Sequence, residues 1–237
     1  MSKGRESLHA WSLAMAISSL AAMAVWLAAP AALTPAAMAA IHATWTFGAF
    51  GYLFAHIRGH RRRADGVTLV RALLCAALFT AHAFDPRPSW GKVSLAILII
   101  VLDGVDGALA RRDGPTERGA VFDMESDAFY VTTMCGVAHL YLGVTPFVFV
   151  IAAMRPIYVC VLAGLRLFGR SPSPNHAGTL RGRLVHVGLV VALIADLTPF
   201  IPVGGKDAIT LIAVALVLYS YAADVARRPG RPSPRGA

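Results

Sequence analysis

Residues 103–127 read DGVDGALARRDGPTERGAVFDMESD, and this stretch decides how the rest of the chain is interpreted. It places four aspartates, Asp103, Asp106, Asp123 and Asp127, at the facing ends of two long apolar segments. An ionised carboxylate inside a bilayer costs roughly 2.5–3.5 kcal/mol on insertion scales, so it needs a partner that offsets this cost. Divalent cations are suitable partners, because Mg²⁺ and Mn²⁺ prefer hard oxygen ligands. The stretch therefore predicts a metal site close to one surface of a membrane.

The composition around this stretch is that of a membrane protein. The chain has 237 residues, of which 57% are hydrophobic, and its mean hydropathy is +0.61. Soluble domains have about 45–50% apolar residues. The apolar segments are also long enough to cross a bilayer. We therefore expect an all-α, polytopic transmembrane helical bundle without a soluble domain. The eight predicted spans lie near residues 11–29, 34–57, 67–84, 91–110, 119–141, 145–168, 180–200 and 206–226.

The basic residues predict the orientation of these spans. The formal net charge is +9, but the arginines gather in the loops after the second, fourth and sixth spans and at both termini. With eight spans, all of these positions fall on one side of the membrane. This is the positive-inside pattern and not a nucleic-acid-binding stripe. We expect both termini and the acidic stretch to be cytoplasmic, with no nucleic acid as a partner.

Helical spacing predicts how the four aspartates meet. Residues three or four apart share one face of a helix. Asp103 and Asp106 therefore lie on one stripe of their helix, and Asp123 and Asp127 lie on one stripe of the next. At 1.5 Å per residue, both pairs lie roughly 6–12 Å in from the connecting loop. Four carboxylates at one depth are expected to hold two metal ions. The alternative is that the acids line a water-filled vestibule or pair with arginines of the loops.

Other polar and aromatic residues are interpreted as structural. The three cysteines have no paired spacing, so neither a disulfide framework nor a zinc site is expected. Glu125 lies two positions from both Asp123 and Asp127, on another face of the same helix, and is expected to be structural or loop-facing. Trp26 and Trp90, near span ends, are expected in the interfacial aromatic belt.

The acidic stretch also resembles a known signature. The pattern Asp103-x-x-Asp106-Gly107-x-x-Ala110-Arg111, followed by Gly119-x-x-x-Asp123-x-x-x-Asp127, is similar to that of the CDP-alcohol phosphotransferase (CDP-alcohol phosphatidyltransferase) family. A weaker similarity extends over about residues 65–226, whose six spans resemble the six-helix core of the family. The domain organisation then has three parts: two extra N-terminal helices over 1–57, the family-like domain over 58–226, and a basic, disordered tail over 227–237.

Three features depart from the family pattern. The spacer between Arg111 and Gly119 is one residue shorter, but it lies in the predicted loop. The segment from Thr68 to Arg71 resembles the start of the family core, where the pattern Asn-x-x-Thr-x-x-Arg is common, and Asp65 replaces the asparagine. The two N-terminal spans have no counterpart in the resemblance.

The resemblance implies a function. It implies an integral membrane transferase of the bacterial inner (plasma) membrane, active in phospholipid biosynthesis. Such an enzyme moves a phosphatidyl group from a CDP-linked donor, here CDP-diacylglycerol, to the hydroxyl of a small alcohol and releases CMP. It also implies two divalent ions, Mg²⁺ or Mn²⁺, and is compatible with a homodimer. The implied metal ligands are Asp103, Asp106, Asp123 and Asp127, with Asp127 also the general base; the implied nucleotide contacts are Asp65, Thr68, Gly107, Ala110 and Arg111.

Two questions stay open at this point. A membrane transporter or channel with an acidic cation path is the alternative function, although such a path does not require the glycine, alanine and arginine of the signature. Within the transferase interpretation, the acceptor is glycerol 3-phosphate, serine, an inositol derivative or another alcohol. Arg118 and Arg166 are candidates to hold an acceptor phosphate. Arg155, deep in its span, is a functional candidate by its position, or it pairs with a helix carbonyl freed by Pro156.

Overall fold

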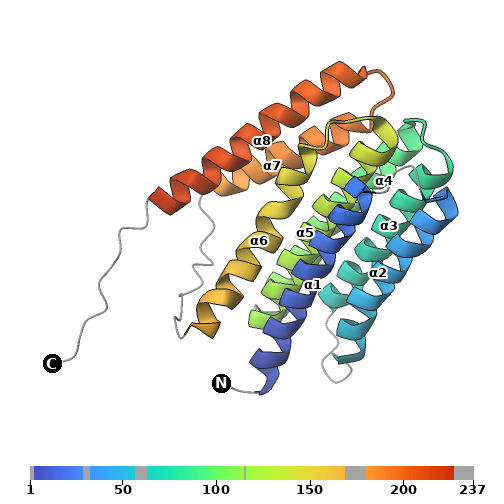
Figure 1. The fold of residues 1–237 in the computed structure, drawn as a ribbon. Coiled ribbons are helices and arrows are strands. Elements are labelled where there is room, and N and C mark those ends of the chain that lie inside the picture. Colours follow the sequence, from blue (N-terminus) through green and yellow to red (C-terminus); the bar gives the residue numbers. More distant parts are fainter. Residues whose placement is uncertain (1–2, 29–32, 57–62, 115, 169–179, 227–237) are drawn as a thin grey trace.

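The computed structural model describes residues 3–28, 33–56, 63–114, 116–168 and 180–226. These ranges contain eight α-helices and no strands, which confirms the predicted helical bundle. The helices run roughly alongside one another, with α7 and α8 inclined across one side (Figure 1). The tail after residue 226, predicted to be disordered, lies outside the described residues. The helices are α1 (Lys3–Ala28), α2 (Pro35–His56), α3 (Arg63–Phe84), α4 (Trp90–Asp113), α5 (Glu117–Leu142), α6 (Val148–Leu167), α7 (Leu180–Asp196) and α8 (Val203–Ala226).

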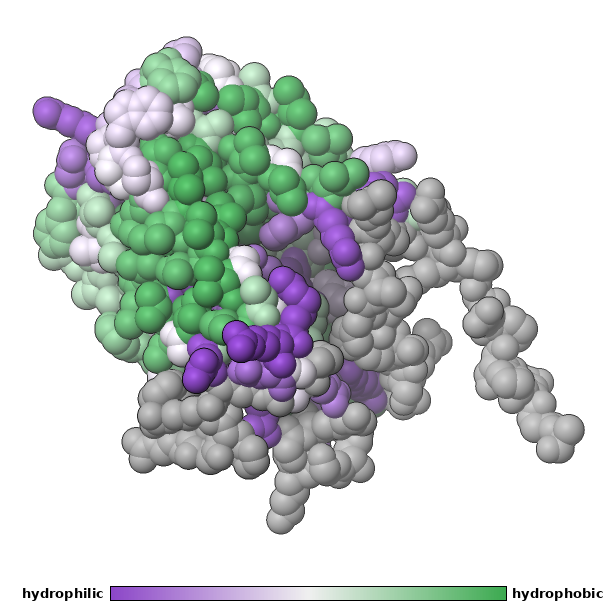
Figure 2. Space-filling model, turned by 180° about the vertical axis from the view of Figure 1, so that it is seen from behind, coloured by the Kyte–Doolittle hydropathy of each residue, from purple (hydrophilic) through white to green (hydrophobic). Residues whose placement is uncertain are grey.

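The surface of the bundle suits a membrane. Among the described residues, five helices (α1, α3, α4, α6 and α8) are long and apolar enough to cross a bilayer. Figure 2 shows a wide hydrophobic surface over one face, with hydrophilic side chains gathered mainly towards its lower end. Helix α5 is more polar than these five, because its acids and hydroxyl side chains lower its hydropathy. Its polar residues are tolerated because other helices surround it.

Helix α5 is central to the bundle, and its ends are well defined. It packs against α1, α3, α6 and α7. It begins after Thr116, whose hydroxyl oxygen accepts a hydrogen bond of 3.1 Å from the backbone N–H of Gly119. It ends at Gly143, whose φ of 72° lies in the left-handed region that glycine adopts without steric cost. The acids of residues 123–127 are therefore carried by a helix that is held on several sides.

The two N-terminal helices are part of the same core. Helix α1 packs against α5 and α6, whereas α2 packs against α3. The expectation that Trp26 lies in an interfacial belt is wrong, because only 1% of its surface is exposed. The Trp26 ring stacks on Phe79 of α3 with centroids 5.5 Å apart. His42 of α2 also stacks on Phe79, with centroids 4.2 Å apart. The N-terminal helices thus contribute aromatic side chains to the packing of α3 and α5.

The position of α3 determines how the acidic helices face each other. Helix α3 packs closely against α4 and also against α5. Direct contact between α4 and α5 is slight, although they follow one another in the chain. A side chain from α3 can therefore reach the aspartates of both helices. The predicted approach of the two aspartate pairs therefore depends on a third helix, α3, that packs against both.

The contact between Trp26 and Gly136 makes one prediction about stability. A Cβ atom at position 136 would lie 2.7 Å from Cζ3 of the buried Trp26 ring, which has no room to move. We expect Gly136→Ala to destabilise the protein by about 1–3 kcal/mol through overpacking. Thermal unfolding in detergent would measure this. Gly188→Ala on α7 is the matched control, because nothing lies within 4 Å of its new Cβ. Equal unfolding temperatures for the two variants would contradict the packing described.

The ends of α4 provide a test of the membrane orientation. Arg87 precedes this helix and Arg112 lies in its last turn, and both residues are exposed. From the distribution of basic residues, we expect a cysteine at position 112 to react with an impermeant maleimide only from the cytoplasmic side. A cysteine at position 87 should react only from the opposite side. The native Cys75 and Cys135 are buried, and the half-buried Cys160 is replaced by alanine in both variants to keep the background low. Labelling of both positions from one side would rule out this orientation.

Candidate metal centre

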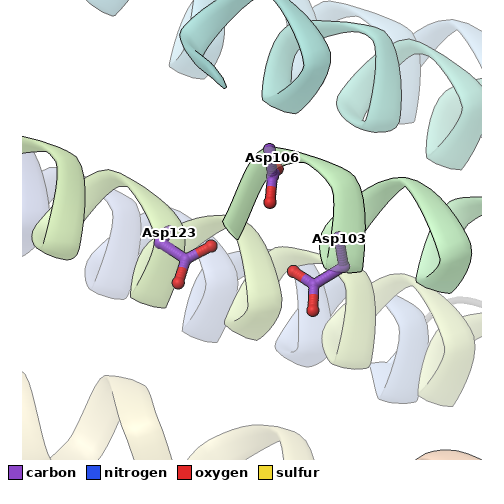
Figure 3. Close-up of side chains that lie close together, drawn as sticks. All are labelled: Asp103, Asp106 and Asp123. Atoms are coloured by element: carbon purple, nitrogen blue, oxygen red, sulfur yellow. The ribbon is translucent and has the colours of Figure 1, made fainter. Parts of the chain in front are cut away.

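Three of the four aspartates converge on one point. Asp103 and Asp106 of α4 and Asp123 of α5 each offer a carboxylate oxygen, and these oxygens lie within 4.8 Å of one another. Figure 3 shows the three carboxylates pointing into the same space from two helices. Asp106 is buried, with 3% of its side chain exposed, whereas Asp123 is half exposed at 52%. Asp106 is therefore the inner residue of the triad, and the side of the triad at Asp123 is accessible to a substrate.

Arg71 of α3 contacts these three aspartates and also Asp127. Its Nη1 atom lies 2.7 Å from Oδ1 of Asp103 and 2.9 Å from Oδ2 of Asp106. The same atom lies 3.9 Å from Oδ1 of Asp123. Its Nη2 atom donates to Oδ1 of Asp127 at 2.9 Å. The Arg71 side chain is itself only 4% exposed, so it is a buried cation shared by four carboxylates.

The donor set fits hard divalent cations. One guanidinium balances only one of the four carboxylate charges, so the cluster keeps an excess of negative charge. Oδ2 of Asp106 accepts from Arg71 and lies 2.8 Å from the hydroxyl of Thr68. The other oxygen of Asp106, Oδ1, is buried and has no hydrogen-bond partner. An unpaired buried carboxylate oxygen is costly, and a bound Mg²⁺ or Mn²⁺ would remove that cost.

Asp127 connects the acidic cluster to a pocket. The pocket has a volume of about 460 Å³ and lies between α5, α6, α7 and α8. Its wall includes Asp127, Arg155 and His186, and the remainder is mostly apolar. Asp127 is not one of the three acids whose oxygens converge, but it is held beside them by Arg71. This carboxylate therefore lies next to both the candidate metal centre and the pocket.

The other site residues predicted from the sequence lie around the same end of α3 and α4. Asp65 is half-buried in the first turn of α3, and Thr68 is buried one turn later against Asp106. Gly107 and Ala110 are half-buried, and Arg111 is exposed. A Cβ atom at position 107 would lie 3.4 Å from Nη1 of Arg111, so the glycine leaves this guanidinium its space. Arg118 and Arg166 are exposed at the ends of α5 and α6.

The sequence alone predicts no role for Arg71. This residue belongs to the short motif from Thr68 to Arg71, which does not indicate that it lies beside the aspartates. The alternative that the acids pair with arginine was correct in part, because the partner is an arginine within a span and not in a loop. A signal was present, since an ionisable residue inside an apolar segment is a functional candidate by default.

Comparison with known proteins identifies the family. The model of the family described as CDP-alcohol phosphatidyltransferase matches residues 62–224, which is more than half of the chain. The match covers α3 to α7 and most of α8, and it leaves out α1 and α2. A search of curated proteins and a search of solved structures find no match.

The contacts of Arg71 predict how stability depends on divalent ions. Arg71→Met leaves four carboxylates without their shared cation, so we expect a loss of about 3–5 kcal/mol in metal-free protein. Saturating Mg²⁺ should restore part of this, because the cation occupies the same oxygens. Thermal unfolding with chelator and with Mg²⁺ would measure both effects. Arg112→Met, which removes an exposed charge, is the control. If both variants unfold alike in chelator, Arg71 does not stabilise the acidic cluster.

Proposed function

The chain belongs to the CDP-alcohol phosphatidyltransferase family, and we propose that it transfers a phosphatidyl group from CDP-diacylglycerol to a small alcohol with release of CMP. The family implies phosphatidyl transfer from a CDP-alcohol in lipid synthesis. One observation supports the proposal most directly. The carboxylates of Asp103, Asp106 and Asp123 converge next to Asp127, which also lines the pocket between α5, α6, α7 and α8. A centre for a diphosphate therefore lies beside a base with room for a second substrate.

The donor side is assigned to α3 and α4. Asp103, Asp106 and Asp123 would hold two divalent ions, with Asp127 as a further ligand. Such ions would supply positive charge that stabilises the attacking and leaving oxygens of the transfer. Arg111, beside Gly107 and Ala110, would bind the nucleotide, and Asp65 and Thr68 lie on the facing helix. Thr68 also orients the inner ligand, since its hydroxyl lies 2.8 Å from Asp106.

The acceptor side is assigned to the pocket next to Asp127. Asp127 would take the proton from the acceptor hydroxyl, and the acceptor oxygen would form a new bond to the phosphorus next to the lipid. The bond between that phosphorus and the CMP oxygen breaks, and CMP leaves with the electron pair. Arg71 would hold Asp127 in place through the 2.9 Å hydrogen bond to Oδ1. The second oxygen of Asp127 is then available for the proton.

Location and assembly are part of the same proposal. Apolar helices indicate an integral membrane protein. We assign it to the bacterial inner membrane with both termini and the metal centre on the cytoplasmic side, where a nucleotide-linked donor is supplied. A homodimer is the assembly that the family resemblance suggests.

The function is tested by CMP release. Purified full-length protein with CDP-diacylglycerol, a panel of alcohols and Mg²⁺ or Mn²⁺ should release CMP, and chelator should stop the reaction. Asp127→Asn removes the base but keeps its size, so we expect turnover to fall about 10²–10⁴-fold. Donor binding should change much less. Asp106→Asn should also weaken Mn²⁺ binding, because a neutral amide is a poorer ligand for a hard cation.

Asp113→Asn is the matched control for this experiment, because Asp113 is an exposed acid at the end of α4. It should keep wild-type turnover. Unchanged CMP release by Asp127→Asn with every acceptor would remove its assigned role. A transporter would give ion flux in vesicles and no CMP from any donor.

A further inference from the structure

A second charged group lies close to the metal centre but is separate from it. Glu125 of α5 is buried, with 2% of its surface exposed. Its Oε1 atom accepts a hydrogen bond of 2.6 Å from Nη2 of Arg155 on α6. The same oxygen accepts a second bond of 2.6 Å from the hydroxyl of Ser12 on α1. One carboxylate oxygen therefore joins three helices, and Arg155 pairs with an acid, not with a helix carbonyl freed by Pro156.

Arg155 reaches the wall of the pocket that contains Asp127. Its side chain is 25% exposed, whereas the Glu125 side chain is 3% exposed, so the cation faces the open side of the pair. The Nε atom of Arg155 is buried and has no hydrogen-bond partner. A guanidinium presents its donors in a planar fork that matches phosphate and carboxylate groups. The wall of this pocket thus contains both an anion-binding group, Arg155, and a proton acceptor, Asp127.

Ser12 gives the pair its orientation. A carboxylate that accepts two short hydrogen bonds on one oxygen has little freedom to turn, and Arg155 is fixed with it. Ser12 itself is buried, with 7% exposed. It lies on α1, which the family match over residues 62–224 does not include. A helix outside the family match is therefore linked to the pocket wall through two hydrogen bonds, from Ser12 to Glu125 and from Arg155 to Glu125.

We propose that Ser12 and Glu125 are positioning residues that hold Arg155 in the pocket wall to bind an anionic group on the acceptor alcohol. The inference rests on the proposed function and adds the chemical class of the acceptor. The acceptor carries a phosphate or a carboxylate besides the hydroxyl that reacts. Arg155 binds this anion, and Asp127 receives the hydroxyl proton. Helix α1 thereby contributes to the choice of acceptor without contacting it.

The experiment compares acceptors with and without the anionic group. Full-length protein is assayed for CMP release with glycerol 3-phosphate against glycerol, and with serine against ethanolamine, at saturating CDP-diacylglycerol and Mg²⁺. The readout is the ratio of kcat/KM for the anionic compound to kcat/KM for its partner. We expect Ser12→Ala to lower this ratio about 3–10-fold through the KM of the anionic acceptor. Arg155→Gln loses a charge-assisted contact and should lower it about 10–150-fold.

Conservative variants separate positioning from folding. Glu125→Gln keeps an oxygen that can accept from Arg155 but removes the charge, and its effect should fall between those of Ser12→Ala and Arg155→Gln. Arg155→Lys should recover part of the ratio, because a cation remains. Ser19→Ala, another buried serine of α1, is the control and should leave the ratio unchanged. Thermal unfolding identifies any variant that fails to fold.

Each outcome decides the proposal. An unchanged ratio in folded Ser12→Ala and Glu125→Gln, or an equal loss with charged and neutral acceptors, overturns it and leaves a purely structural ion pair. Binding of glycerol 3-phosphate and serine is measured in parallel by titration calorimetry. If the wild type releases no CMP from any donor, the proposed function fails. Anion binding that is lost in Arg155→Gln would then still support the site, and no binding by the wild type would overturn it.

Discussion

The structure depends on how charge is paired inside an apolar bundle. Four carboxylates within a few ångströms repel one another, and the repulsion is screened least at Asp106, whose side chain is buried. Arg71 contacts all four acids from a third helix. It offsets only part of their charge, so the cluster remains suited to divalent cations and a diphosphate. The same contacts tie α3 to α4 and α5, which have little direct contact with each other. The candidate metal centre is therefore also a structural junction.

Helix α5 carries different chemistry on different faces. One face presents Asp123 to the metal centre, and Asp127 lies one turn further, between that centre and the pocket. Another face buries Glu125 against α1 and α6. Further along, Gly136 lets the Trp26 ring approach the backbone. Because α5 packs against α1, α3, α6 and α7, a polar residue such as Glu125 is buried among protein side chains. This arrangement explains why the helix with the most functional groups is less hydrophobic than its neighbours.

The N-terminal helices extend the family domain in a specific way. They lie outside the matched residues, yet Trp26 and His42 stack on Phe79 within the shared core. Ser12 adds a polar contact close to the proposed acceptor pocket. A helix outside a catalytic domain can alter substrate preference by contacting residues that position a substrate-binding side chain. The groups that perform the reaction then stay unchanged. In this protein such an influence would act through Glu125 and Arg155.

Local spacing and hydropathy were enough to predict several features from the sequence. Apolar length predicted eight helices, and the spacing of Asp103, Asp106 and Asp123 predicted carboxylates at one depth, because helix periodicity depends only on near neighbours. The family signature is likewise a local pattern. Tertiary structure alone decided that Arg71 enters the acidic cluster and that Trp26 is buried, not interfacial. It also decided that Glu125 pairs with Ser12 and Arg155. The Glu125 contacts join residues that are 30 and 113 positions apart in the sequence. A periodic pattern along one helix does not specify which other helix it faces, so only the packing of the bundle decides such contacts.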